Sequence, residues 1–376
     1  MSPTLPLCAV FCVFGASAGG MAAEFPDQYR EPFAKSWPIR QKQHLQMKAY
    51  LDSLPAQKRE EADAEFKLDL SSPEAYERSL APVREQMKKT LGWPPPKAVK
   101  DPKPRFELVA RDKAADIYRV WTEVFEGVEA YAIYMVPYGL KGKAPVIVAV
   151  HGGGGCPEAI CDLDTRANYR SFGHEAAKRG YIVYAPGILM AVGYAKPPDP
   201  APKGLSHRDL REQAQKLGTD TNSLQIYQII EGTMAVIKAR PEADADRIGM
   251  TGLSMGAMYT LSTVPLWPDV KVAVPSAGLA QRGDEPDREQ DLATLNLGSR
   301  RDRTQAGALI CPRPLMIQSG KADGVVPYKG AKRAVPKIRA YYEKLGIADR
   351  FEFSVHEGGH VFENEAIFRF FDKHLR

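Results

Sequence analysis

The spacing of apolar residues changes near residue 105 and predicts two regions of different structure. From Arg105 onward, short runs rich in β-branched and aromatic residues are separated by turn signals such as Glu126-Gly127. Three of these runs follow one another closely and favour antiparallel strands at the entry to a sheet. They are FELVA, DIYRVWTEVF and AYAIYMVP. We therefore expect a main domain that covers residues 104–376.

Further along this domain, continuous apolar runs alternate with helical patterns. An amphipathic helix is predicted over 222–239, and another helix near 171–179. Continuous apolar strands that alternate with helices predict a mostly parallel central sheet with helices on both faces. Ligands of such sheets bind beyond the carboxyl ends of the strands. The expected strands are PVIVAVHG (145–152), YIVYAPG (181–187), RIGMTGLS (247–254), VKVAVPSAG (270–278), RPLMIQSG (313–320) and RFEFSVHEG (350–358).

Residues 24–103 are polar and rich in Lys, Glu, Gln and Pro. Ser72 followed by Pro73 and Glu74 is typical of a helix start, because Pro is tolerated in the first turn. Gly92, followed by Trp93 and three prolines, predicts the end of that helix. We expect an N-terminal helical extension that packs on the main domain and is not an independent domain.

The first 23 residues resemble an export signal. Leu5 to Phe14 is mostly apolar, and small residues follow, so cleavage after Ala18 or Ala23 fits the small-residue rule. No Lys or Arg precedes the apolar run, and the alternative is a disordered leader. The run is too short to span a bilayer. We expect a periplasmic or secreted protein with no stable membrane insertion after signal cleavage.

Composition and charge indicate which classes of binding partner to expect. The chain is 44% hydrophobic and 26% charged, which is ordinary for a globular protein. The net charge of +5 is spread along the chain, with Lys and Arg among Asp and Glu. This pattern predicts a solvated, mildly basic surface and no nucleic-acid partner.

The clearest chemical motif is G-x-S-x-G, which runs from Gly252 to Gly256 with Ser254 at its centre. The two glycines permit a sharp turn from strand to helix that lifts the serine hydroxyl above the sheet. An apolar strand precedes the motif and small residues follow it. The alternative is a plain connection between a strand and a helix. We predict that Ser254 is a catalytic nucleophile.

A serine nucleophile needs a general base, and the base needs an acid that orients it. In hydrolases that carry the serine on such a turn, the chain order is Ser, then Asp or Glu, then His. Asp323 and His360 each follow a predicted strand and occur in this order. We therefore predict the triad Ser254, Asp323 and His360. The rival base is His356, which lies closer to its strand.

Four glycines, 152–155, follow His151 at the end of a predicted strand. Such a loop can approach a substrate closely and donate a backbone N–H to an oxyanion. We expect this donor to be Gly153 or Gly154, and the second donor to be the backbone N–H of Met255. A phosphate-binding loop is disfavoured, because no Gly-Lys-Ser/Thr follows.

A competing motif spans His356 to His360, which spells H-E-x-x-H, a zinc-protease signature. That chemistry needs a helix, so that both histidines lie on one face. Two glycines inside the motif disfavour a helix by about 1 kcal/mol each relative to alanine. The preceding FEFSV alternates like a strand. We therefore expect no metal site here, and nothing in the sequence calls for a cofactor.

Together these motifs resemble the dienelactone hydrolase and acetyl xylan esterase-like branch of the α/β-hydrolases, over roughly residues 72–376. The resemblance implies an α/β-hydrolase fold with Ser254 as nucleophile, Asp323 as acid and His360 as base. The four-glycine run departs from it and looks more like the hormone-sensitive-lipase branch, which has an Asp where this chain has Leu253. The matching segments are DADRI (244–248) before GLSMG, CPRPL (311–315) before Gly320 and Asp323, EGGH (357–360), and LGWP (91–94) in the extension.

These features favour an exported carboxylic ester hydrolase that acts through an acyl-enzyme. The alternatives are a serine peptidase of the prolyl-oligopeptidase type, for which the N-terminal arm is too short, and a non-catalytic binding protein on a hydrolase scaffold. Segments 188–218 and 279–310 are polar and are expected to overhang the site. They favour a small-molecule or carbohydrate ester as the substrate over a triglyceride.

Three cysteines lie outside the leader. Cys156 and Cys161 flank a four-residue stretch directly after the glycine run. In an oxidising compartment they could form a disulfide that stiffens this loop, and the alternative is two buried free thiols. Cys311 begins an apolar strand and is expected to stay free in either case.

Overall fold

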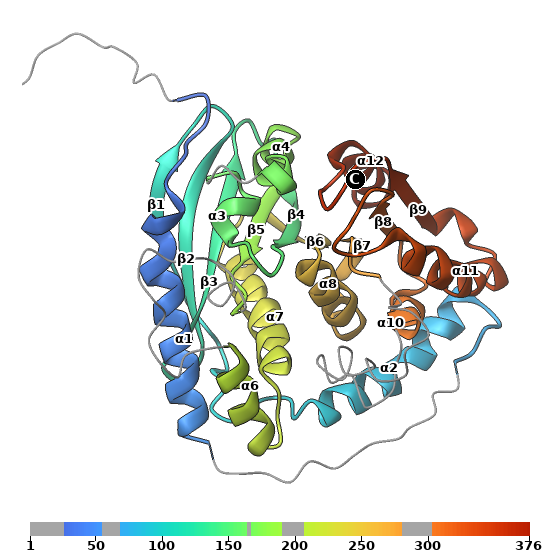
Figure 1. The fold of residues 1–376 in the computed structure, drawn as a ribbon, viewed down its shortest axis with the longest axis horizontal. Coiled ribbons are helices and arrows are strands. Elements are labelled where there is room, and N and C mark those ends of the chain that lie inside the picture. Colours follow the sequence, from blue (N-terminus) through green and yellow to red (C-terminus); the bar gives the residue numbers. More distant parts are fainter. Residues whose placement is uncertain (1–25, 55–67, 164–166, 190–206, 280–302) are drawn as a thin grey trace, which may run out of the picture.

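The computed structural model describes residues 26–54, 68–163, 167–189, 207–279 and 303–376. Within these ranges a nine-stranded sheet forms the centre, in the order β1-β2-β3-β5-β4-β6-β7-β8-β9 (Figure 1). The strands are β1 (Pro104–Arg111), β2 (Ala115–Phe125), β3 (Val128–Pro137), β4 (Ala144–Val150), β5 (Ile182–Pro186), β6 (Ala243–Leu253), β7 (Val270–Ser276), β8 (Leu315–Gly320) and β9 (Phe351–His356). Each predicted strand is present.

The sheet has an antiparallel part and a parallel part. β1, β2 and β3 form an antiparallel meander, and β3 also pairs antiparallel with β5. From β5 through β4, β6, β7 and β8 to β9, every adjacent pair is parallel. β4, β5 and β8 are buried along their whole length, as expected for strands covered on both faces. The predicted antiparallel entry and mostly parallel sheet are confirmed.

Helices cover both faces of the sheet. Successive residues of β4 alternate between two apolar clusters. Val146 and Val148 pack with α7 (Thr221–Ala239) and α8 (Met255–Leu266), and Ile147 and Ala149 pack with α4 (Phe172–Lys178) and α12 (Asn364–Leu375). This is the α/β-hydrolase arrangement. The helices are α1 (Trp37–Asp52), α2 (Pro73–Thr90), α3 (Pro157–Ile160), α4 (Phe172–Lys178), α6 (His207–Lys216), α7 (Thr221–Ala239), α8 (Met255–Leu266), α10 (Arg303–Ile310), α11 (Tyr328–Lys344) and α12 (Asn364–Leu375).

Three helices match the predictions from local sequence. α4 and α7 occupy the ranges expected from the apolar pattern. α2 begins as expected, because the Ser72 hydroxyl accepts a hydrogen bond from the Ala75 N–H at 3.1 Å. The chain leaves α2 through Gly92 at φ 71°, a left-handed conformation that glycine adopts without a steric penalty.

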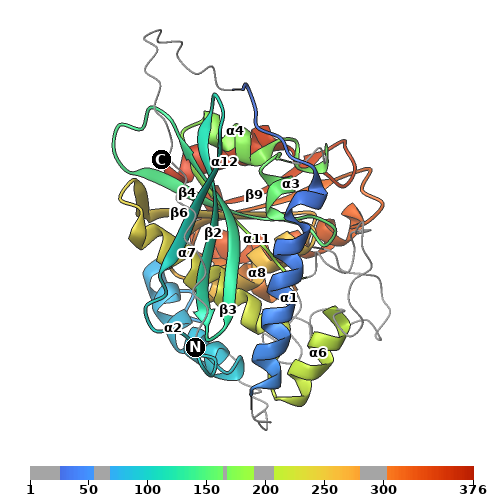
Figure 2. The ribbon, with the colours of Figure 1, turned by 90° about the vertical axis from the view of Figure 1, so that its left-hand side faces the viewer.

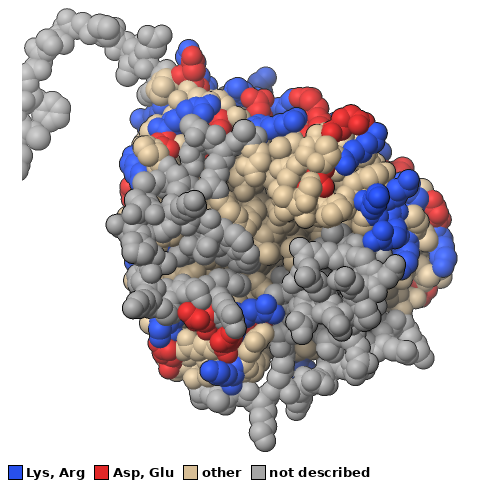
Figure 3. Space-filling view, in the orientation of Figure 1, with Lys and Arg blue, Asp and Glu red and all other residues tan. Residues whose placement is uncertain are grey.

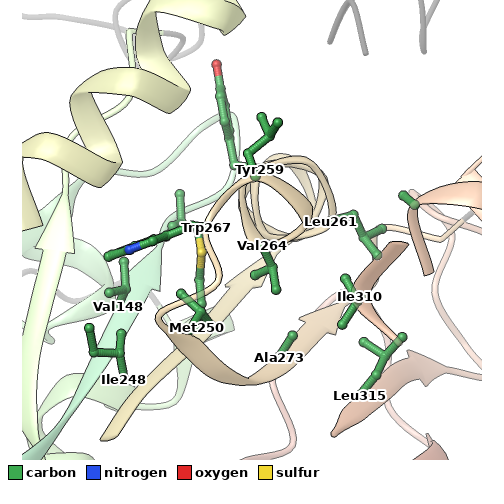
Figure 4. Close-up of a cluster of buried hydrophobic side chains, with 14 of the residues drawn as sticks. Val148, Ile248, Met250, Tyr259, Leu261, Val264, Trp267, Ala273, Ile310 and Leu315 are labelled. Carbon is green, nitrogen blue, oxygen red and sulfur yellow. The ribbon is translucent and has the colours of Figure 1, made fainter. Parts of the chain in front are cut away.

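α8 is held on the sheet by a dense apolar contact (Figure 4). Its side chain Val264 points toward Ala273 of β7, and Leu261 lies near Ile310; all four residues are buried. Full burial of a side chain of this size contributes about 1.5–3 kcal/mol. This packing therefore fixes the position of α8, whose amino end carries the G-x-S-x-G turn.

The N-terminal extension packs on this body through both of its helices. Figure 2 shows α1 alongside the antiparallel strands, with α6 next to it. The ring of Tyr50 in α1 stacks on Phe125 of β2, with centroids 4.7 Å apart. In α2, the Tyr76 hydroxyl donates a hydrogen bond to the Ala308 carbonyl of α10 at 2.9 Å. α1 thus packs on the antiparallel strands, whereas α2 packs on the helices α8 and α10.

A buried charge network anchors the start of the extension. The Arg119 guanidinium of β2 donates to Glu31, and its Nε donates to the Tyr131 hydroxyl at 3.2 Å. Tyr131 in turn donates to Glu158 of α3, which also lies 3.7 Å from Arg40 of α1. All five side chains are buried, so each charge depends on its partners for solvation.

Some expectations fall outside the described residues. The predicted export signal, residues 1–23, is one of them, and so is most of the expected overhang, residues 190–206 and 280–302. The described parts of these two segments include α6, which packs on α1 and α7, and α10, which packs on α8 and α11. In the described part of the chain, no helix is long and apolar enough to cross a membrane.

Candidate active site

Ser254 lies between the end of β6 and the start of α8, as predicted. Its backbone has φ 60° and ψ −115°, a conformation that is strained for a residue with a Cβ. Its side chain is partly exposed, whereas Leu253 before it is buried. The turn therefore lifts Ser254 out of the sheet, which is the geometry expected of a nucleophile on such a motif.

The two glycines of the motif are required by close packing. A Cβ on Gly252 would lie 2.3 Å from the carbonyl of Gly256, on the far side of the turn. A Cβ on Gly256 would lie 2.0 Å from the carbonyl oxygen of Val150, at the end of β4. Real Cβ atoms do not make such contacts, so the turn can be this sharp only with glycine at both positions.

Asp323 and His360 meet in the structure. Nδ1 of His360 lies 2.8 Å from Oδ2 of Asp323, and the other carboxylate oxygen accepts the N–H groups of Val325 and Val326, at 2.8 Å each. The Asp323 side chain is fully buried, and that of His360 is 20% exposed. With Nδ1–H donated to the carboxylate, Nε2 of His360 is the nitrogen that can accept a proton.

A chain of hydrogen bonds connects the Ser254 turn to the His360 loop. The Ser254 N–H donates to the Ser276 carbonyl of β7 at 2.9 Å, and the Ser276 hydroxyl donates to Oε1 of Gln318 in β8 at 2.6 Å. Nε2 of Gln318 donates to the Glu363 carbonyl, three residues beyond His360, at 2.9 Å. Sequence reasoning missed Gln318, although a polar residue inside the apolar run LMIQSG could have indicated it.

The glycine loop lies directly against Ser254. A Cβ on Gly152 would be 3.4 Å from Cβ of Ser254. The Gly152 N–H donates to the Tyr169 hydroxyl at 2.8 Å, and the Gly155 N–H donates to the Gly152 carbonyl at 3.0 Å. Gly153 and Gly154 are partly exposed, and their N–H groups have no acceptor among the described residues.

His151, before the glycines, is buried and shapes the loop. Its Nε2 accepts the Ile188 N–H at 3.1 Å, and its Nδ1 lies 2.8 Å from the Gly152 carbonyl. With Nε2 accepting, Nδ1 carries the proton and donates to that carbonyl. The ring thus ties the loop to the chain after β5, and both of its nitrogens are engaged.

Comparisons with known proteins identify the family of the chain. A family model described as the dienelactone hydrolase family matches residues 131–366. The chain belongs to the dienelactone hydrolase family. The resemblance inferred from the motifs is therefore confirmed, and the matched range extends from β3 into α12.

Individual relatives of this dienelactone hydrolase family member are distant. The Bacillus subtilis protein YtaP, whose name describes it as a hydrolase, is 24% identical over 267 residues, which cover 66% of this chain and 84% of YtaP. A Bacteroides fragilis structure described as an acetyl xylan esterase has a TM-score of 0.60 at 15% identity and covers 82% of this chain and 80% of that one. A glucuronoyl esterase from Solibacter usitatus has a TM-score of 0.58 at 16% identity, and the match covers 85% of this chain and 98% of that one. These structures share the fold.

The H-E-x-x-H segment of this hydrolase-family chain is not helical. His356 ends strand β9, and residues 357–361 form bends before α12. The Glu357 side chain is exposed and pairs with Lys321 at 2.5 Å. Burial, together with the nearby charge of Arg170, lowers the pKa of His356. Among the described residues, no three His, Cys, Asp or Glu side chains are grouped so that they could hold a metal ion.

Cys156 and Cys161 are two buried free thiols, the second of the two alternatives. They cap the two ends of α3. A helical path of five residues advances about 7.5 Å, beyond the roughly 7 Å between Cα atoms that a disulfide tolerates. Burial raises the pKa of both thiols well above the ordinary value. The expectation that a bridge stiffens the glycine loop is wrong, and Cys311 is free as predicted.

A cavity of about 550 Å³ lies away from this site. It is lined by residues of α2, α7 and the carboxyl end of α8, including Trp93, Tyr227 and Leu266. Ser254 precedes the opposite, amino end of α8. The cavity therefore does not belong to the candidate site, which lies at the carboxyl ends of β4, β6, β8 and β9.

Proposed function

We propose that the protein is an exported serine-dependent carboxylic ester hydrolase that acts through an acyl-enzyme. The observation that carries this proposal is the hydrogen bond between His360 and a buried Asp323, at the same edge of the sheet as Ser254 on its strained turn. Acyl transfer by a serine requires a histidine base that an acid orients, and here all three residues lie at one edge of the sheet.

In the proposed reaction, the hydroxyl oxygen of Ser254 attacks the ester carbonyl carbon while Nε2 of His360 takes the hydroxyl proton. The C–O bond to the alcohol then breaks, and His360 gives the proton to the leaving oxygen. Water, activated by His360, attacks the acyl-enzyme and releases the acid and free Ser254. Asp323 takes no proton and stabilises the imidazolium.

The negative charge on the carbonyl oxygen needs two donors. We assign them to the N–H of Met255 and to the N–H of Gly153 or Gly154. In support, the Met255 N–H has no acceptor among the described residues, and the two glycine N–H groups are likewise unoccupied. Removal of one such donor costs about a hundredfold to a thousandfold in other serine hydrolases.

The proposed substrate is a small-molecule or carbohydrate ester. Figure 3 shows that the described surface between α4 and α12 is hollowed and mostly free of charged residues, with charged residues of both signs along its upper and right-hand edges. A surface with few charged residues suits a neutral polar ester. The structures that share the fold include an acetyl xylan esterase and a glucuronoyl esterase by name, which is compatible with this substrate class.

The decisive experiment combines a covalent probe with a substrate panel. A fluorophosphonate should label wild type at Ser254, and Ser254→Ala should lose the label and at least about a thousandfold in turnover. Ser262→Ala is the matched control, because Ser262 is buried in α8 and, among the described residues, its hydroxyl bonds only the Met258 carbonyl of the same helix. Nitrophenyl esters of rising chain length, acetylated xylan and a peptide amide should separate esterase from peptidase. Label at another residue, or activity that survives Ser254→Ala, contradicts the proposal.

A further inference from the structure

The hydroxyl of Tyr169 occupies the inside of the glycine loop. Tyr169 is 1% exposed, and its oxygen accepts the Gly152 N–H at 2.8 Å. A Cβ on Gly155 would lie 2.1 Å from the same oxygen. The loop therefore closes around one phenol oxygen, and glycine at position 155 makes room for it.

The segment around Tyr169 also contacts the loop that carries His360. The Phe362 N–H donates to the Asn168 carbonyl at 2.9 Å, and the rings of Tyr169 and Phe362 lie 6.0 Å apart. The Asn364 side chain donates to the Arg170 carbonyl at 2.7 Å. Residues 168–170 thus join the glycine loop on one side to the His360 loop on the other.

Backbone strain marks the same place. Arg170 and Ser171 have φ values of 49° and 56°, in the left-handed region that residues with a Cβ rarely adopt. Two such residues in succession persist only where the surrounding structure holds them. The hydroxyl of Ser171 donates to Asp162, which fixes the chain immediately after Tyr169.

From these contacts we infer that Tyr169 is a positioning residue of the proposed esterase, on which this inference rests. By accepting the Gly152 N–H, it fixes the loop so that the next free N–H groups, those of Gly153 and Gly154, are presented beside Ser254. Because the same segment contacts the His360 loop, the oxyanion donor and the general base keep one relative position. Such preorganisation lowers the barrier without a reorganisation cost during the reaction.

The first test is Tyr169→Phe, which keeps the ring and removes the acceptor. We expect kcat to fall about tenfold to a hundredfold with KM changed less than about threefold. Inhibition by a boronic acid, which mimics the tetrahedral state, should weaken by the same factor as kcat/KM. Tyr181→Phe is the matched control, since Tyr181 is equally buried and donates to Asp372 at 2.6 Å. Unchanged kcat in a folded Tyr169→Phe protein overturns the inference.

The second test is a double-mutant cycle. Gly155→Ala alone should lower turnover strongly. The loss should be smaller in the Tyr169→Phe background, where the nearest ring atom to the added Cβ is Cζ, at 3.1 Å. If Gly155→Ala does not fold, recovery of folded protein in the double variant is the expected result. Effects that simply add contradict the inference. Gly324→Ala is the control, because a Cβ there would meet open space. Its effect on turnover should be the same in wild type and in Tyr169→Phe.

A third measurement does not depend on catalysis. Amide hydrogen exchange over 152–155 should accelerate in Tyr169→Phe, because the loop loses its central acceptor. Unchanged exchange in that variant overturns the inference even if the wild type proves to hydrolyse no ester. The two failures can be told apart. If wild type neither hydrolyses esters nor reacts with the fluorophosphonate, the proposed function is refuted. Accelerated exchange in Tyr169→Phe would still support the role of Tyr169 in the loop.

Discussion

His360 and Asp323 are 37 positions apart in the chain and meet through a hydrogen bond of 2.8 Å between Nδ1 and Oδ2. The carboxylate is buried and has three donors, so it cannot rotate without losing backbone partners. The imidazole is therefore fixed in one tautomer and one orientation while part of its ring stays exposed.

The two histidines of the 356–360 segment should differ sharply. His360→Ala should lose about as much turnover as Ser254→Ala, roughly a thousandfold or more, because members of a triad act as a unit. His356→Ala should lower turnover by less than about tenfold. His356 ends β9, and among the described residues the histidine hydrogen-bonded to Asp323 is His360. Steady-state kinetics on a nitrophenyl ester decides the ranking. The opposite ranking would mean that the base is His356.

Metal removal should have no effect on turnover. Activity should survive EDTA, and Glu357→Gln should retain it to within about tenfold, because Glu357 is an exposed partner of Lys321. A zinc protease loses its general base with that change. Elemental analysis of the purified protein supplies the check: one zinc per chain, with activity restored only by zinc, would replace the serine mechanism.

Stability should depend on pH through His356. Burial lowers its folded-state pKa below 6.5, so between that lowered pKa and about 6.5 the unfolded chain binds more protons than the folded one. The contribution of this group to stability is therefore present above about pH 6.5 and is lost as the pH falls toward the lowered pKa. His356→Gln should flatten this part of the profile. Urea denaturation from about pH 7.5 to about pH 5 measures it, and an unchanged profile excludes His356 as the source.

The G-x-S-x-G turn should not tolerate a single methyl group at Gly256. Its Cβ would overlap the Val150 carbonyl, which is backbone and cannot move aside, so the free energy of unfolding should fall by about 3 kcal/mol or more. Gly324→Ala is the control, with an expected change within about 0.5 kcal/mol. Denaturant titration of both variants compares them. Equal stabilities would show that the turn is looser than its contacts indicate.

The buried network should depend on Arg119. Arg119→Met leaves Glu31 without its buried partner, and the free energy of unfolding should fall by about 3–5 kcal/mol. Arg111→Met, which removes an exposed pair with Asp116, should cost less than about 1 kcal/mol. If the two variants are equally stable, the network does not anchor the extension.

The parts of the molecule that follow from local pattern were predictable, and those that depend on distant contacts were not. The strands, α7 and the Ser254 turn follow from periodicity and glycine spacing, which short segments carry by themselves. Tyr169 acts only because the fold brings it to Gly152, and an aromatic residue in a polar stretch gives no sign of that. For Cys156 and Cys161, spacing suggested a bridge, whereas the intervening residues form a helical turn that separates them.

The anchoring of the extension also has a kinetic consequence. Glu31 and Arg119 are separated by 88 positions, and the contact from Gln28 to Asp162 spans 134. Contacts that distant close slowly, because the entropy of the intervening chain must be lost before they form. Residues 28–31 therefore cannot complete these contacts until the chain has been synthesised as far as Asp162. We expect α1, the first α-helix among the described residues, to be among the last to fold.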